Sequence, residues 1–191
     1  MSDGAIPDPK AIREAEEAGL VFSEDKKTLL ECRNKMIEKA VIPDGVTEIR
    51  EWAFSGITTL TSVKIPESVT EIGPSAFEDC TALIDVTFPD GITKIAECAF
   101  LYCSALTGMK IPDGVTEIGG EAFRGCSSLA EVKLPDCVTE IGGWAFAGCS
   151  ALACINIPDS VTEIGAEAFA GAGCEEQVRR DYPRLFKRTE T

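Results

Sequence analysis

The sequence contains no histidine. Catalytic arrangements of the Ser/His/Asp or Cys/His kind are therefore excluded, because each needs an imidazole as its general base. The nine cysteines form no Cys-x-x-Cys pair, and no phosphate-binding or dinucleotide-binding glycine motif is present. Carboxylate pairs are plentiful, but they recur so regularly that none stands out as a site. We therefore expect no enzymatic activity, no cofactor and no metal site.

The sequence also lacks a long apolar run. A membrane helix needs roughly 18 uninterrupted apolar residues, and no stretch approaches that length. The first residues have neither the basic nor the apolar segment of a secretory signal. As it stands, the sequence predicts a cytoplasmic protein without membrane insertion, and nine cysteines without a pairing pattern fit a reducing compartment. If a signal has been removed, a cell-surface or secreted location is expected instead.

Basic residues are scarce, with 18 lysines and arginines against 32 acidic residues and a net charge of −14. Nucleic-acid binding requires a basic footprint that neutralises phosphates, so this balance argues against it. Attraction to an anionic membrane surface is disfavoured for the same reason. The acidity itself is most simply explained by solubility, although it would also suit a basic or neutral partner.

What the sequence does contain is a repeat. Six consecutive units of 23 residues follow one another without insertion or deletion, at 42–64, 65–87, 88–110, 111–133, 134–156 and 157–179. The shared pattern is approximately I-P-D-x-V-T-x-I-x-x-x-A-F-x-x-C-x-x-L-x-x-V-x. One such unit cannot bury its apolar side alone, whereas stacked units turn each apolar column into a continuous ridge inside a coil. The sequence therefore predicts a solenoid.

The apolar spacing within the unit predicts its local structure. The end of L-x-x-V-x-I alternates inward and outward residues and is rich in branched side chains, which indicates a strand. The following proline ends that strand because it has no N–H group. Val-Thr-Glu-Ile predicts a second short strand, and the stretch around Ala-Phe a short helical turn.

The pattern L-x-x-V-x-I-P-x-x-V-T-x-I-G-x-x-A-F-x-x-C resembles the BspA-type leucine-rich repeat over residues 42 to about 179, preceded by a degenerate unit. The resemblance implies an α/β solenoid, here of a bacterial protein: a right-handed leucine-rich-repeat coil of short parallel strands with a binding role. At the usual Asn/Cys position stand Gly45, Ser68, Gly91, Gly114, Cys137 and Ser160, so the asparagine ladder of common leucine-rich repeats is absent.

Both ends predict caps, which a solenoid needs because its terminal coils would otherwise expose core. Residues 1–41 are expected to form an N-terminal cap, with Asp8 as N-cap of a helix over 10–18 and a hairpin after it. Residues 42–179 form the repeats, and 180–191 a C-terminal cap or tail. A helix is predicted over 174–181, and Val178, Tyr182, Leu185 and Phe186 are candidates to cover the last coil. The alternative to a C-terminal cap is a tail at 179–188 that binds a partner.

Four columns could carry chemistry, and each has a structural explanation that we prefer. Cys80, Cys103, Cys126 and Cys149 share a column between inward-facing columns, so we expect small buried thiols in place of a metal ladder or disulfides. The threonines at the sixth position could bind ice or carbohydrate, but threonine also suits an exposed strand. The acidic third and seventh columns could bind calcium, but no known calcium-loop pattern is present.

The outward strand positions are the candidate binding residues. In leucine-rich folds such positions line the concave face, and here they differ between repeats while the inward positions do not. The candidates are Ser62, Lys64, Asp85, Thr87, Lys110, Glu131, Lys133, Cys154 and Asn156. Lys64, Lys110 and Lys133 form a basic run among them. Trp52 and Trp144 share another column but are four coils apart, too far to form one aromatic platform.

These observations predict a monomeric, non-catalytic interaction module or scaffold that binds a protein partner through the concave face. The alternative is a cell-surface or secreted adhesin that binds host protein or glycan, as the family resemblance suggests. A third hypothesis is hydrolase activity from a carboxylate pair.

Overall fold

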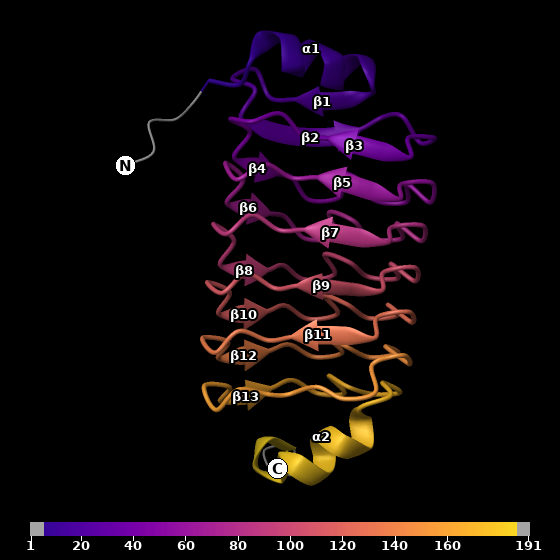
Figure 1. The fold of residues 1–191 in the computed structure, drawn as a ribbon, viewed down its shortest axis with the longest axis vertical. Helices are drawn as coiled ribbons and strands as arrows, with labels where there is room; N and C mark the ends of the chain where they lie inside the picture. The colour runs from indigo at the N-terminus through magenta and orange to yellow at the C-terminus, as the bar shows by residue number, and fades with distance from the viewer. Residues whose placement is uncertain (1–5, 187–191) are drawn as a thin grey trace.

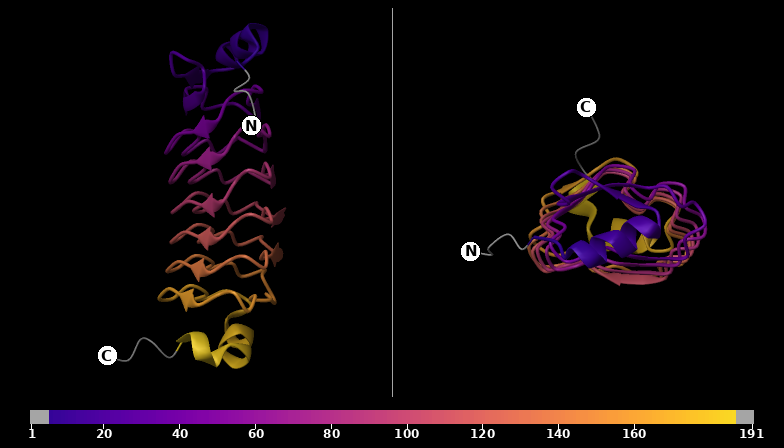
Figure 2. Two further views of the ribbon diagram at one scale, coloured as in Figure 1. Left: turned by 90° about the vertical axis from the view of Figure 1, so that its left-hand side faces the viewer. Right: turned by 90° about the horizontal axis from the view of Figure 1, so that it is seen from above.

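The computed structural model describes residues 6–186, and the predicted solenoid is confirmed (Figure 1). The repeats stack along the long axis, with α1 (Pro9–Glu17) at one end and α2 (Glu175–Asp181) at the other. Seen along that axis, the coils superimpose into one flattened ring (Figure 2). Every coil therefore presents the same positions of the repeat to the same side of the molecule.

Two families of short strands run along opposite parts of the ring. One consists of β3 (Lys39–Val41), β5 (Ser62–Lys64), β7 (Asp85–Thr87), β9 (Gly108–Lys110) and β11 (Glu131–Lys133). The other consists of β4 (Glu48–Ile49), β6 (Glu71–Ile72), β8 (Lys94–Ile95), β10 (Glu117–Ile118), β12 (Glu140–Ile141) and β13 (Glu163–Ile164). Pairing within both families is parallel and in register with the repeat, so that Val63 lies beside Val86 and Ile118 beside Ile141. Both predicted strands of the unit are thereby confirmed.

Neither strand family forms one continuous hydrogen-bonded sheet along the whole stack. The strand orders are β1-β2-β4-β6, β8-β10-β12-β13, β3-β5-β7 and β9-β11. Residues 154–156 continue the outward column but form no strand, which differs from the expectation for the fifth repeat. Here the C-terminal cap supplies side-chain partners: the N–H of Ile155 donates to Gln177 Oε1 at 3.1 Å, and that of Ile157 donates to Tyr182 Oη at 3.0 Å.

A column of phenylalanines forms the centre of the core. Consecutive members from Phe54 to Phe169 stack with ring centroids 5.2–5.6 Å apart and planes within 18° of parallel. This separation is close to the spacing of about 4.8 Å between paired strands, so the coil repeat places each ring in offset contact with the next. All members from Phe54 to Phe146 are fully buried.

The short helical turn expected around Ala-Phe is present as a chain of i→i+3 turns in place of a regular helix. The N–H of Ala53 donates to Arg50 O at 3.2 Å, whereas that of Phe54 donates to Ala76 O of the next coil at 2.8 Å. Alternate amides thus bind within the coil and between coils. Trp52 has φ +56°, a left-handed conformation that interrupts any continuous helix.

The N-terminal cap has the predicted parts. Asp8 accepts a hydrogen bond from the N–H of Lys10 at 3.0 Å and begins α1, whose Ile12 and Ala15 are buried. The helix leads into the antiparallel hairpin of β1 (Leu20–Phe22) and β2 (Thr28–Cys32), and β2 pairs with β4 of the first repeat. The cap is thereby continuous with the repeat ladder.

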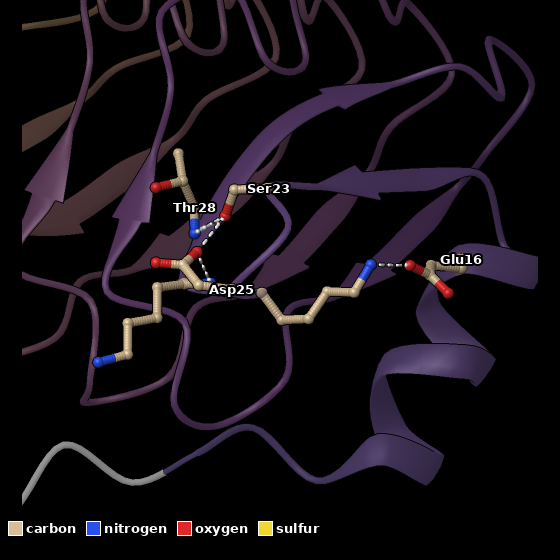
Figure 3. A network of polar contacts seen from close by, with 6 residues as sticks. Glu16, Ser23, Asp25 and Thr28 are labelled. Carbon is tan, nitrogen blue, oxygen red and sulfur yellow. Dashed lines mark hydrogen bonds and ion pairs between the residues drawn. The ribbon is translucent and has the colours of Figure 1, made fainter.

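Side chains close the hairpin turn and attach it to α1 (Figure 3). The hydroxyl of Ser23 donates to Asp25 at 2.6 Å and accepts from the N–H of Thr28 at 3.0 Å. The ammonium of Lys26 donates to Glu16 of α1 at 2.8 Å. Hydrogen bonding from Ser23 is the main reason why the pKa of Asp25 is lowered. The carboxylate therefore remains ionised and holds the turn.

At the other end, Val178 of α2 is fully buried, and Tyr182 and Leu185 pack against the core. Leu185 belongs to a 3-10 helix over Pro183–Phe186. These contacts confirm three of the four residues predicted to cover the last coil. The side chain of Phe186, and residues 187–191 of the predicted cap or tail, lie outside the described part.

Candidate interaction surface

The outward side chains of β3, β5, β7, β9 and β11, together with those at 154 and 156, form one surface, called the strand face below. It contains every predicted binding residue. Lys64, Asp85, Thr87, Lys110, Glu131, Lys133, Cys154 and Asn156 are exposed, and Ser62 is half-buried. The alternation is as predicted, since Val63, Val86, Met109 and Val132 between them are buried. Folding therefore gathers the candidates on one side without burying any of them fully.

The register decides which candidates are neighbours. Lys110 is directly beside Lys133 in the β9–β11 pair, and Glu131 is beside Gly108. In the β5–β7 pair, Lys64 is beside Thr87, and Ser62 is beside Asp85. Two like charges opposed on neighbouring strands are unfavourable for folding. The Lys110–Lys133 pair is therefore a local positive site on an otherwise acidic chain.

An acidic column borders this basic run. Lys110 Nζ lies 3.9 Å from Asp113 Oδ2, and both side chains are largely exposed. The other members of the column are Asp44, Glu67, Asp90, Asp136 and Asp159. The strand face thus carries a positive strip beside a negative one, a pattern that suits a partner of mixed charge.

The strand face ends against the C-terminal cap. Asn156 Oδ1 accepts a hydrogen bond from the hydroxyl of Tyr182 at 3.1 Å. Asn156 is therefore engaged in closing the solenoid, although sequence analysis placed it among the binding residues on equal terms. Cys154 is exposed beside it as a free thiol.

The threonine column has a structural role on the opposite strand family. The hydroxyl of Thr139 donates to Thr116 O at 3.2 Å, and that of Thr162 donates to Thr139 O at 3.3 Å. These bonds support the strand explanation of the column. Charge repulsion in the neighbouring acidic column is reduced at Lys94, whose Nζ lies 2.6 Å from Glu117 Oε1.

The four cysteines of the shared column are free and fully buried, as predicted. Each thiol also donates to the carbonyl oxygen of a phenylalanine in the preceding repeat, for example Cys126 to Phe100 at 3.1 Å. Burial raises the pKa of Cys80 and of Cys149 to about 12. These thiols are poor nucleophiles and poor ligands, because both roles need the thiolate. Among residues 6–186, no group of three or more His, Cys, Asp or Glu side chains could hold a metal ion.

Two features of the surface were missed by sequence analysis. Ser68 Oγ donates to Val46 O at 2.7 Å, and Cys137 Sγ to Val115 O at 3.0 Å, so short side chains replace part of the absent asparagine ladder. Trp144 is not an isolated residue, because the Arg124 guanidinium lies 6.0 Å from its ring centroid. Residues one repeat apart make these contacts, and only a repeat alignment with known coil geometry could have indicated them.

No helix in the described part of the chain is long and apolar enough to cross a membrane. Comparison with known families shows a match to the BspA type leucine rich repeat region, in six copies over residues 31–151 and 102–178. No curated protein sequence matches the chain.

Solved structures of bacterial leucine-rich repeat proteins are similar to this one. A T. pallidum leucine-rich repeat protein has 28% identity and a TM-score of 0.68, with 92% of this chain and 96% of that chain covered. A leucine-rich cell surface protein from Faecalibacterium prausnitzii has 37% identity and a TM-score of 0.66, over 72% of this chain and 37% of that one. A Bacteroides ovatus leucine-rich repeat protein has 29% identity and a TM-score of 0.58, over 79% and 48%. This chain thus spans less than half the length of the last two.

Proposed function

Because this chain belongs to the BspA-type leucine-rich repeat family, we propose that it is a non-catalytic module that binds a protein partner through the strand face. The observation that carries the proposal is the contrast between columns. The inward residues of the strands are held to Val, Met or Ala by packing, whereas the outward ones differ in charge and size from coil to coil. Proteins use such rigid, variable surfaces for recognition.

Charge on the strand face gives the proposal its chemistry. Lys64, Lys110 and Lys133 are exposed on a chain of net charge −14, and the last two are direct neighbours. Complementary acidic groups on a partner would relieve that repulsion, while basic groups would meet the bordering acidic column. The module acts as a monomer in this proposal, because helices cover both end coils.

Charge reversal tests this proposal. The triple variant Lys64→Glu, Lys110→Glu and Lys133→Glu should weaken binding to a partner captured with the wild-type chain by at least about tenfold. A matched control reverses three exposed charges elsewhere, Lys10→Glu, Arg13→Glu and Arg50→Glu, and changes the net charge equally. Equal affinity of the triple variant and the wild type would show that the strand face is not the binding surface.

A second candidate is a cell-surface or secreted adhesin that binds host protein or glycan. It is favoured by the 37% identity to a protein described as a leucine-rich cell surface protein. Fractionation of the source cells distinguishes the two locations: the surface role requires the chain to be accessible to protease on intact cells. Protection from protease until the cells are lysed would exclude it.

A further inference from the structure

The contact between the second repeat (65–87) and the third (88–110) differs from the other contacts in the stack. On one side, β6 pairs with β4 and β8 pairs with β10, but β6 and β8 do not pair. On the other, β7 pairs with β5 and β9 with β11, but β7 and β9 do not pair. In the part of the chain that the structure describes, every other pair of consecutive repeats keeps at least one ladder.

Two backbone hydrogen bonds that form between other consecutive repeats are missing at this contact. Thr70, Thr116, Thr139 and Thr162 each donate their N–H to the threonine carbonyl one repeat earlier, at 2.8–2.9 Å. The N–H of the residue after each inward isoleucine donates likewise to the preceding isoleucine, as Gly119 does to Ile95 O at 2.8 Å. Within residues 6–186, neither Thr93 nor Ala96 makes the corresponding bond to Thr70 or Ile72.

Position 96 supplies the physical reason. At this column, glycine occurs in the second, fourth, fifth and sixth repeats, as Gly73, Gly119, Gly142 and Gly165. A Cβ added at these glycines would lie 2.2–2.6 Å from a backbone nitrogen of the preceding repeat. Real Cβ atoms do not approach backbone so closely, so regular stacking requires glycine here. Ala96 has the methyl group that this spacing excludes.

The methyl group of Ala96 therefore acts as a wedge between the second and third coils. Arg50 also has a side chain at this column, but it lies at the contact between the first repeat and the N-terminal cap, where its N–H donates to Leu29 O at 2.9 Å. Beside the wedge is an opening of about 440 Å³ lined by Thr70, Glu71, Pro74, Lys94 and Glu97 among others. A second opening, of about 350 Å³, lies between Asp85 and Lys110 on the strand face.

The turn side of the same contact remains closed. Ser75, Phe77 and Asp79 donate their N–H groups to Glu97, Ala99 and Leu101 of the next repeat at 3.0, 2.9 and 2.8 Å. The rings of Phe77 and Phe100 stack at 5.2 Å, as closely as any pair in the column. The closed part continues to Ile84, whose carbonyl oxygen accepts from the N–H of Thr107 at 3.3 Å. Two coils held along this arc and unpaired along both strands have the geometry of a hinge.

We propose that this contact is a hinge built into the solenoid by Ala96. It divides the protein into two rigid blocks, 9–87 and 88–186, that rotate about the arc of hydrogen bonds from Ser75 to Ile84. Opening widens the gap between β6 and β8 and changes the distance between Lys64 and Lys110 on the strand face. Motions of this kind take place in microseconds to milliseconds.

Amide hydrogen exchange and residual dipolar couplings test the hinge in the full chain. In the wild type, the Thr93 amide should exchange about a hundredfold faster than that of Thr116, after correction for intrinsic rates. Couplings of residues 9–87 and 88–186 should require two alignment tensors of different magnitude. Ala96→Gly should slow the Thr93 amide towards the rate at Thr116 and allow one tensor to describe both blocks.

Gly119→Ala is the matched control, since it places the same methyl group one repeat later. It should speed exchange at Thr116 and leave Thr93 unchanged; if it prevents folding, the Ala96→Gly comparison is sufficient alone. Equal exchange at Thr93 and Thr116 in the wild type, one shared tensor, or an Ala96→Gly variant with unchanged Thr93 exchange would each overturn the proposal.

Discussion

The thiol of Cys126 in the fourth repeat donates a hydrogen bond to the main-chain oxygen of Phe100 in the third, at 3.1 Å. The same relationship joins Cys80 to Phe54, Cys103 to Phe77 and Cys149 to Phe123. Phe100 O also accepts from the N–H of Cys103 at 3.2 Å, so the thiol fills a small apolar space and is a second donor to a buried carbonyl group. The column is part of the structure that connects one coil to the next.

Cys126→Ala should lower the free energy of unfolding by about 1–2 kcal/mol, because it removes both the sulfur from the core and the donor to Phe100. Denaturant titration measures the loss. Cys154→Ala, at the exposed cysteine, is the control and should change stability by less than about 0.5 kcal/mol. A Cys126→Ala variant as stable as the wild type would contradict a structural role for the thiol.

Stability should fall at high pH. Burial raises the pKa of Cys80 and Cys149 from 9.0 to about 12. Above pH 9 the unfolded chain releases these protons while the folded chain keeps them, so stability present below pH 9 is lost as the pH rises towards 12. The expected slope is about 1 kcal/mol per pH unit for each thiol. Thermal unfolding measured from pH 8 to 11 should show a shallower decline in the Cys80→Ala, Cys149→Ala double variant.

Phe100→Ala should lower the free energy of unfolding by about 3–5 kcal/mol, because the ring stacks on Phe77 and Phe123 and meets Phe88 edge-on at 5.5 Å. Phe169→Ala should cost less, since that ring ends the column and stacks only on Phe146 in the described part. The two variants are compared by the midpoint of unfolding in denaturant. Equal losses would show that the stacking neighbours contribute little beyond burial.

Tyr182→Phe should lower stability by about 1–2 kcal/mol, because the N–H of Ile157 loses its acceptor at 3.0 Å and is left unsatisfied at the last edge. The Ile157 amide should also exchange faster. Arg184→Ala is the control: it removes only an exposed ion pair with Asp159, which contributes at most about 1 kcal/mol. Unchanged exchange at Ile157 in Tyr182→Phe would contradict a role for this tyrosine in closing the edge.

The strand face shows how far prediction from sequence extends. Lys110 and Lys133 could be assigned to one outward column because the apolar residue before each of them must face the core. In an alternating strand, burial of that residue places the lysine on the outer face. The same reasoning placed Asn156 on that column. It could not show that Asn156 is hydrogen-bonded to Tyr182, because that contact depends on where the C-terminal cap packs against the last coil.

The sequence by itself determined the coil length, the inward columns and the caps, since repeated burial of Phe, Ile and Leu leaves one way to align 23-residue units. The tertiary structure alone decided how closely each pair of coils approaches. That distance depends on the side chain at the column of Ala96, because the glycines of this column leave no space for a methyl group. Alanine at 96, in a column that holds glycine in four of the other five repeats, therefore interrupts the ladder between β6 and β8, although the 23-residue spacing continues through it.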